Sequence, residues 1–230
     1  MQQVTINQRW MLTLPDHRAR GDWWDHWEEE RLASMAEHLN EFDLIAYIGA
    51  EQGDMPALCA SWGCATVLVE PVGKVWPGIR ATFEANGLPL PWATFAGFAG
   101  ATDHFAHEHL VERWWPPEAE GPVSDVEGFA NLCERPDLPV ITLNTIRSVV
   151  GPLSAISIDV EGSELEVLRG AAAAVLTKDR PKVWVSIHPD FMHDMYDQEP
   201  WEVHSLMESH GYVGTLLADV HEQHWYFEPK

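Results

Sequence analysis

The sequence predicts a single α/β domain, residues 1–230, in which helices cover both faces of a mostly parallel sheet. Five apolar runs typical of buried strands alternate with segments that carry apolar residues every three to four positions, as amphipathic helices do. A glycine turn follows the first of these strands, and two strands at 212–217 and 223–227 predict a final antiparallel hairpin. The 230-residue chain is long enough to bury the core of one such domain.

The first 41 residues are expected to precede the sheet as an arm, residues 1–20, and one helix. Apolar positions at helical spacing predict the helix over 22–39: Trp23, Trp27, Leu32, Met35, Ala36 and Leu39. Glu28, Glu29 and Glu30 are expected on its solvent side. Two interpretations of the tryptophan-rich stripe stay open, because it either packs on the protein's own sheet or joins two copies in a homodimer.

The first predicted strand, 42–48, leads into a turn that contains Gly49 and Gly53. Glycines at these positions let the backbone approach a ligand closely, and the N-terminus of the next predicted helix, 54–62, faces the same point. The turn lacks the G-x-G-x-x-G pattern of dinucleotide-binding proteins. It therefore predicts a site for a nucleotide-like ligand of another kind.

Two further strands end in residues that suit such a ligand. The strand predicted over 65–69 ends at Glu70-Pro71, where an acidic side chain can accept hydrogen bonds from both hydroxyls of a ribose. The strand predicted over 92–98 ends in Phe98 and Ala99, and the small residues there leave room for a flat base. A helix is predicted between these strands, through Ile79 and Phe83.

Residues 102–139 form a long connection, which in a compact domain is usually a lid or an acceptor-binding loop. Three histidines lie in it: His104, His107 and His109. No acidic third ligand is fixed by their spacing, so we favour a solvated or substrate-facing segment over a metal site. Trp114 and Trp115 follow, with flat faces that suit a ring-shaped acceptor. A short strand at 140–143 then enters a helix at Asn144.

Two acidic residues follow the central strand, which begins at Ser154. Asp159 and Glu161 lie at its carboxyl end, before a helix predicted from Ser163 to Val175. His188 follows the strand predicted over 182–187, so parallel strands place it at the same edge of the sheet. The alternative interpretation is structural, with the carboxylates at a helix start and the histidine held by hydrogen bonds.

Composition excludes several function classes. The net charge of −22, with only 14 Lys and Arg residues, argues against a nucleic-acid partner, because such binding depends on neutralising phosphates. The three cysteines, Cys59, Cys64 and Cys133, form no metal-type pattern and predict reduced thiols. No apolar run is long enough to span a bilayer and no signal peptide is evident, so a cytoplasmic location is expected.

Four segments resemble the FkbM family of S-adenosylmethionine-dependent methyltransferases over residues 42–187. They are IDVEGSELEVLRGA at 158–171, YIGAEQG at 47–53, VEP at 69–71 and ITLNTI at 141–146. The resemblance implies a class I methyltransferase (Rossmann-like) three-layer sandwich, with seven strands of which the last is antiparallel. It also implies S-adenosylmethionine as cofactor and O-methylation of a sugar or secondary-metabolite hydroxyl. Three positions depart from the family pattern: Tyr47 replaces an acid, Glu51 an asparagine and Asn144 an aspartate.

The resemblance also implies roles for individual residues. Cofactor-binding residues would be Tyr47, Gly49, Ala50, Glu51, Gly53, Glu70, Pro71, Phe98, Ala99 and Asp159. Catalytic residues would be Asp159, Glu161 and His188, which surround the transferred methyl group, with Asp159 or His188 as the base. We further expect Glu51 to supply the cofactor's ammonium with the carboxylate that Tyr47 lacks.

Three alternatives to an active methyltransferase stay open. The first is a degenerate module of the same fold that binds a cofactor or a protein partner, as the substitution at Tyr47 suggests. The second is a nucleotide-dependent oxidoreductase that holds a nicotinamide ribose at Glu70. The third is a metal-dependent hydrolase that uses Asp159, His188 and either His221 or His224.

Overall fold

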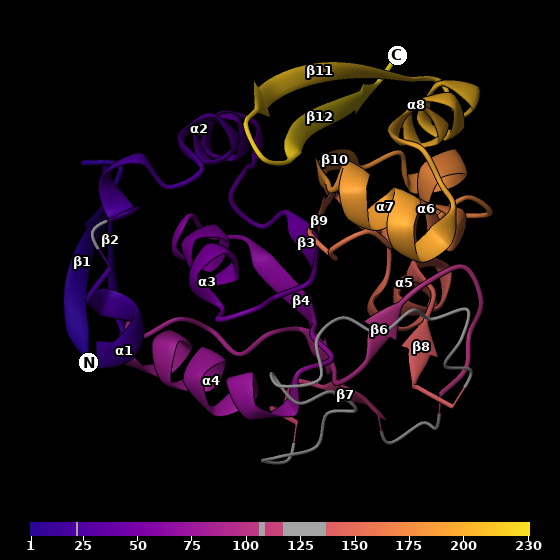
Figure 1. The fold of residues 1–230 in the computed structure, drawn as a ribbon. Helices are drawn as coiled ribbons and strands as arrows, with labels where there is room; N and C mark the ends of the chain where they lie inside the picture. Colours follow the sequence, from indigo (N-terminus) through magenta and orange to yellow (C-terminus); the bar gives the residue numbers. More distant parts are fainter. Residues whose placement is uncertain (22, 106–108, 117–136) are drawn as a thin grey trace.

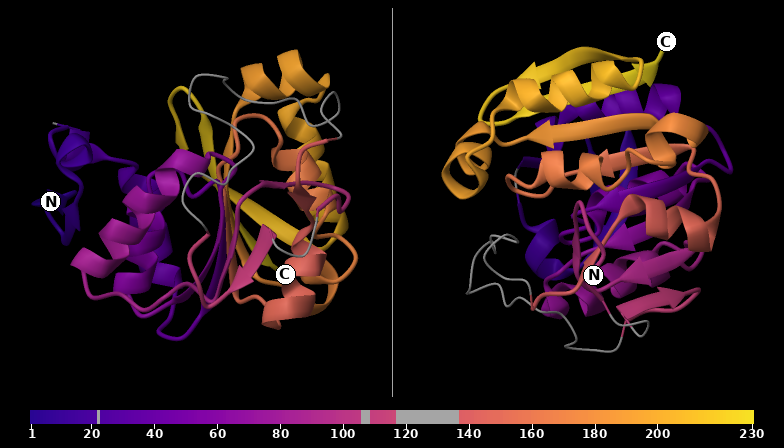
Figure 2. Two further views of the ribbon diagram at one scale, coloured as in Figure 1. Left: turned by 90° about the horizontal axis from the view of Figure 1, so that it is seen from below. Right: turned by 90° about the vertical axis from the view of Figure 1, so that its right-hand side faces the viewer.

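The computed structural model describes residues 1–21, 23–105, 109–116 and 137–230. It confirms the predicted α/β class, with helices on both faces of a mostly parallel sheet (Figure 1). Seen from below, the helices of the first half of the chain lie on one side of the sheet and those of the second half on the other (Figure 2).

The main sheet has eight strands in the order β11–β12–β10–β9–β3–β4–β5–β7. Their bounds are β3 Leu44–Ile48, β4 Ala65–Val69, β5 Ala93–Phe95, β7 Leu110–Glu112, β9 Ala155–Ile158, β10 Lys182–Ile187, β11 Tyr212–Asp219 and β12 Gln223–Pro229. Strands β5, β4, β3, β9 and β10 pair in parallel, whereas β12 is antiparallel to β10 and β11. The eighth strand is β7, which pairs antiparallel with β5 and was not predicted.

The third predicted strand is divided in two. Only Ala93–Phe95 joins the main sheet as β5, while β6 (Phe98–Ala99) pairs in parallel with β8 (Val140–Ile141) in a separate two-stranded sheet. Gly97 permits the change of direction, because a Cβ there would lie 2.7 Å from the carbonyl oxygen of Pro139. The apolar run therefore continues past the strand and turns Phe98 and Ala99 toward the carboxyl edge of the sheet.

Helices and two cores cover the sheet. The helices are α1 Asp16–Ala19, α2 Glu29–His38, α3 Asp54–Ser61, α4 Trp76–Ala85, α5 Leu143–Val150, α6 Glu164–Arg169, α7 Pro189–Tyr196 and α8 Pro200–Ser209. Short helical turns occur at η1 Trp23–His26, η2 Gly73–Val75 and η4 Val175–Asp179. One core unites the inward side chains of α5 to α8 with one sheet face, and the other unites α2, α3 and α4 with the opposite face. Alternating side chains of the strands supply both cores, since neighbours along a strand point to opposite faces.

The N-terminal segment differs from the predicted arm and continuous helix. Two strands, β1 (Gln2–Ile6) and β2 (Trp10–Leu14), form a hairpin that buries Ile6 and Leu14. The predicted helix is broken into η1 and α2 at Glu28, which has a left-handed backbone with φ of 42°. Glu28 was expected in solvent, but its side chain is 18 % exposed and turns toward the sheet. Helix α2 packs against β11 and β12 and buries Leu32 and Met35, whereas Trp23 of the predicted stripe is 44 % exposed.

Other local expectations are corrected in the second half of the chain. The helix that follows Ser163 ends at Arg169 rather than Val175, and the Ser163 hydroxyl bonds to the carbonyl of Val160 instead of capping the helix. Asn144 has a structural role, because its side-chain oxygen accepts hydrogen bonds from the backbone N–H groups of residues 174 and 175. Helix α7, which follows His188, was not predicted.

The long connection is described only in part. His107 and Cys133 lie outside the described residues. Trp115 is buried and packs edge-on against Phe83, so it belongs to the core, whereas Trp114 is 66 % exposed. Cys59 and Cys64 are buried free thiols, as predicted. Among the described residues, no helix combines the length and apolar character required to cross a membrane.

Candidate functional site

A cavity of about 720 Å³ opens at the carboxyl ends of the parallel strands. Most of the predicted site residues line it: Tyr47, Gly49, Ala50, Glu51, Glu70, Pro71, Phe98, Ala99, Asp159, Glu161 and His188. Gly53 does not line the cavity, and instead begins α3 with a φ of 82° against Ile79. The strand ends thus bring together residues that are far apart in the sequence, as expected for an open α/β sheet.

The glycine turn brings two strands into close contact at the floor of the cavity. Gly49 has a φ of 82°, and a Cβ at this position would lie 1.7 Å from the backbone oxygen of Asp159. Its N–H, like that of Ala50, donates to the carbonyl of Val69 at the end of β4. Only glycine fits both the backbone conformation and the approach of β9.

Glu70 is held as an acceptor at the end of β4. One carboxylate oxygen accepts from the backbone N–H of Glu51 at 2.7 Å and the other from that of Val72 at 2.8 Å. Burial raises the pKa of Glu70 to about 7, although the two backbone donors lower it in part. Each oxygen keeps one lone pair for a further donor, such as one of two neighbouring hydroxyls of a ligand.

Arg31 of α2 is fully buried beneath the cavity and was not predicted. Its Nη1 forms ion pairs with Glu28 at 2.8 Å and Asp159 at 2.7 Å, and bonds to Ser186 Oγ at 2.7 Å. Its Nη2 bonds to Ser157 Oγ at 2.8 Å. Burial alone lowers the pKa of Arg31, but its neighbours outweigh burial and raise that pKa well above the ordinary value. Asp159 therefore faces a permanent positive charge.

Tyr47 takes part in the same network, which gives its departure from the family pattern a structural reason. Its hydroxyl lies 3.3 Å from Nη2 of Arg31, and its ring is buried against α2 and α3. A carboxylate there would be a third acid around Arg31, beside Glu28 and Asp159. The tyrosine hydroxyl is a neutral partner for the guanidinium group instead.

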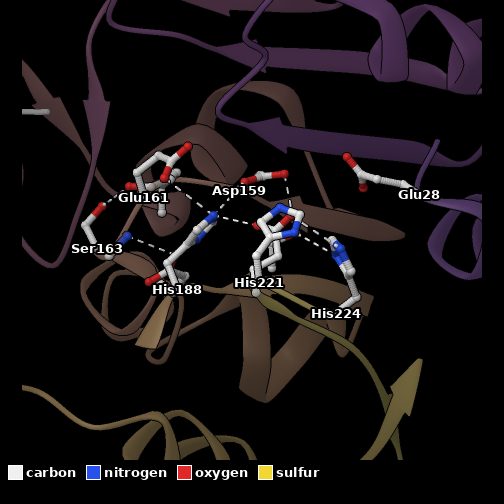
Figure 3. A network of polar contacts seen from close by, with 12 residues as sticks. Glu28, Asp159, Glu161, Ser163, His188, His221 and His224 are labelled. Atoms are coloured by element: carbon white, nitrogen blue, oxygen red, sulfur yellow. Dashed lines mark hydrogen bonds and ion pairs between the residues drawn. The ribbon is translucent and has the colours of Figure 1, made fainter. Parts of the chain in front are cut away.

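Four carboxylates surround His188, and Figure 3 shows several of these side chains turned toward one another. Nδ1 lies 2.7 Å from Glu164, while Nε2 lies 2.6 Å from Glu222, 3.5 Å from Glu161 and 3.8 Å from Asp159. Burial on its own lowers the pKa of His188, but the bonds to Glu164 and Glu222 and the charge of Asp159 raise it to about 11. The surrounding carboxylates therefore favour the protonated form of the ring at neutral pH.

Glu222 is the second site residue that sequence reasoning missed. It lies in the turn between β11 and β12, where a run of polar residues is typical of any hairpin connection. His221 and His224, the histidines of the hydrolase alternative, approach Glu222 at 3.3 and 3.4 Å (Figure 3). The His221 side chain is 81 % exposed, and His224 bonds to Ser186 Oγ at 3.0 Å.

A family model described as "Methyltransferase FkbM domain" matches residues 43–213. The chain belongs to this family. The segment that matches the FkbM model contains the glycine turn, Glu70, Asp159 and His188. Arg31 precedes this segment and Glu222 follows it. A sequence comparison with curated proteins finds no match.

Solved structures agree with the class I methyltransferase fold. The 16S rRNA N2 G1207 methyltransferase of T. thermophilus, in complex with AdoMet and guanosine, has a TM-score of 0.54 and 12% identity. That match covers 100% of the FkbM chain but only 50% of the rRNA methyltransferase. The ribosomal protein L11 methylase of Lactobacillus delbrueckii subsp. bulgaricus has a TM-score of 0.51 and 8% identity, over 88% of this chain and 78% of its own. At these identities the likeness shows the fold.

Proposed function

We propose that this FkbM protein transfers a methyl group from S-adenosylmethionine to a hydroxyl group of a sugar or secondary metabolite. The observation that carries the proposal is the buried Glu70 carboxylate, fixed by two backbone amides beside the glycine turn and bordering the cavity. When bound, S-adenosylmethionine supplies a methyl group on a sulfonium, which a nucleophilic oxygen displaces. Membership of a methyltransferase family and the AdoMet bound by a protein of the same fold support this cofactor.

The described residues fit the cofactor in three parts. Glu70 keeps two free lone pairs for the ribose hydroxyls. Gly49 and Ala50 line the cavity beside Glu70 and would border the methionine portion with backbone rather than with a large side chain. Phe98 and Ala99 border the cavity and provide an apolar face for the adenine ring.

We assign the cofactor's ammonium group to Glu51. Tyr47 occupies the position of the usual acid, but its hydroxyl is neutral and lies beside Arg31. It therefore provides no negative charge for the ammonium group. Glu51 lines the cavity next to the glycine turn and uses its backbone N–H, rather than its carboxylate, to bond Glu70. Its carboxylate therefore stays available for a cation in the cavity.

Asp159, Glu161 and His188 are the proposed catalytic group, with Glu161 as the proton acceptor. Asp159 is bonded to Arg31, and both nitrogens of His188 face carboxylates. Among the described residues, the Glu161 carboxylate approaches only His188, at 3.5 Å, and it lines the cavity. Geometry thus favours Glu161 over the two bases preferred from the sequence, because its oxygens are the least committed.

The charge of the site favours a neutral or cationic acceptor. Carboxylates of Glu51, Asp159, Glu161 and Glu222 border the cavity, and the whole chain carries a net charge of −22. A phosphate-rich acceptor would be repelled, so exclusion of nucleic acid stays our prediction. The fold itself gives no such exclusion, since one protein that shares it methylates 16S rRNA.

The first test is calorimetric titration with S-adenosylmethionine and S-adenosylhomocysteine. We expect micromolar binding, weakened at least tenfold by Glu70→Ala and by Glu51→Gln, and unchanged by Glu84→Gln, a matched acid that is 59 % exposed on α4. Transfer of a labelled methyl group to a panel of polyhydroxylated acceptors then tests catalysis. Absence of binding to both ligands would contradict the proposal, and binding without turnover would favour the degenerate module.

A further inference from the structure

Three side chains from three different elements converge beside the cofactor cavity. Asp159 follows β9, His188 follows β10 and Glu222 lies between β11 and β12. Each offers one ligand atom, and these atoms all lie within 4.8 Å of one another. Two ligands of one ion are separated by up to about twice its bond length of ~2.1 Å, so small side-chain adjustments bring all three into coordination.

The second ring nitrogen of His188 contacts a carboxylate, as is frequent for metal-binding histidines. Its Nδ1 faces Glu164 at 2.7 Å, which fixes the ring and directs Nε2 at Asp159 and Glu222. Glu164 is not one of the three ligands, and its own position is fixed by the backbone N–H of Gly162. A carboxylate that orients the second nitrogen of a histidine is a frequent companion of metal ligation.

Glu164 also provides an independent observation that favours a further cation near His188. Its side chain is fully buried, and its oxygen Oε2 has no hydrogen-bond partner among the residues that the structure describes. A buried unsatisfied carboxylate oxygen is costly unless cations lie nearby. In the described part of the site, four carboxylates face the single ring of His188. Arg31 offsets one of these carboxylates by its ion pair with Asp159, so the local charge stays net negative even when the ring carries a proton.

We propose that Asp159, His188 and Glu222 bind a divalent transition-metal ion of the Mn²⁺, Fe²⁺ or Zn²⁺ class. Two carboxylate oxygens with one imidazole nitrogen suit these ions better than Mg²⁺ or Ca²⁺, which prefer oxygen ligands alone. On binding, the ion takes the place of the proton between Nε2 and Glu222, and this proton leaves to solvent.

The position of the ion suits it to bind the acceptor hydroxyl, and this step rests on the proposed function. All three ligands line the cavity, so the open coordination positions face the acceptor. A hydroxyl oxygen bound there becomes more acidic and is held in place, both of which assist methyl transfer. Glu161 lines the same cavity, is not one of the three ligands and stays available to take the hydroxyl proton.

The test is a titration of the full-length protein with MnCl₂, followed by the loss of the electron paramagnetic resonance signal of free Mn²⁺. We expect one bound ion per chain with a dissociation constant in the micromolar range. Asp159→Asn, His188→Gln and Glu222→Gln should each weaken binding at least tenfold, whereas Glu228→Gln, an exposed acid on the same hairpin, should not change it. Circular dichroism establishes that each variant is folded.

A second measurement on the unaltered protein does not depend on the variants. Electron spin-echo spectra of the Mn²⁺ complex should show modulation from an imidazole nitrogen. Failure to bind at 1 mM Mn²⁺, binding that the three folded variants leave intact, or absence of nitrogen modulation would each overturn the inference. Calorimetry with S-adenosylhomocysteine keeps the two proposals apart, because cofactor binding without Mn²⁺ binding removes the metal site and leaves the proposed function standing.

Discussion

Replacement of Arg31 by methionine tests the view that one buried charge organises the site. Methionine is apolar and of similar length, so the change removes the guanidinium group without leaving a large cavity. Glu28 and Asp159 would then be left facing each other without their shared cation, and Ser157 would lose a hydrogen bond. We expect a marked loss of stability, because a buried carboxylate without its partner is poorly solvated.

The magnitude follows from the burial of the three charged groups. Removing one partner of a buried ion pair costs about 3–5 kcal/mol. The side chains of Glu28 and Asp159 are 18 % and 26 % exposed, so water offsets part of this cost and we take about 3 kcal/mol. For a domain of this size, that loss lowers the melting temperature by roughly 6–12 °C.

The assay compares Arg31→Met with Arg80→Met in thermal denaturation at pH 7.5. Arg80 pairs with Glu84 on the surface of α4, with both side chains more than half exposed. Such a pair contributes at most about 0.5 kcal/mol, so the control should melt within about 2 °C of the wild type. Equal melting temperatures for the two variants would refute the reasoning, since burial is the main difference between the pairs.

Two further predictions concern Gly49 and Glu70, which are proposed to bind the cofactor. Gly49→Ala should lower stability by several kcal/mol and abolish S-adenosylhomocysteine binding, because the added Cβ would lie 1.7 Å from the backbone oxygen of Asp159. Gly87→Ala isolates the backbone cost of about 1–2 kcal/mol, since it also has a positive φ but no atom within 4 Å of its Cβ, and similar melting curves would contradict the clash. Affinity for S-adenosylhomocysteine should rise as the pH increases from about 6 to 8, because burial raises the pKa of Glu70 to about 7 and its carboxylate form accepts the ribose hydroxyls. Calorimetry at several pH values checks this, and a flat profile would show that Glu70 does not hold the ribose.

The sequence was most informative where a strand ends. Apolar runs locate β3, β4, β9 and β10, and parallel pairing then places the residues after each run at one edge of the sheet. This reasoning predicts that Glu70, Asp159 and His188 share one edge of the sheet, and all three line the cavity. It works because strand periodicity is a local signal, and because parallel strands place their carboxyl ends at the same edge of the sheet.

Arg31 and Glu222, two of the site residues that the sequence did not predict, show where local patterns stop being informative. Arg31 lies four residues after Trp27 and four before Met35, so a charged residue occupied the buried stripe of the predicted helix. That position was a usable signal, because an arginine on a buried face needs buried acids as partners. Glu222 had no comparable signal, since its place beside His188 depends on the register of β12 against β10. Side-chain periodicity predicts which face a residue occupies, but not which distant acid it meets.

The polar groups around Asp159 and His188 come partly from inside and partly from outside the matched family segment. The matched family segment, residues 43–213, contains the glycine turn and Glu70, which fit a cofactor. Two of the charged partners of Asp159 and His188 lie outside it, with Arg31 before the segment and Glu222 after it, whereas Glu164 lies within it. Helix α2 packs on the β11–β12 hairpin, so the two flanking elements support each other as well as the site. Substitutions in the two flanks are therefore expected to disturb Asp159 and His188 more than Glu70, whose carboxylate is held by two backbone amides inside the matched segment.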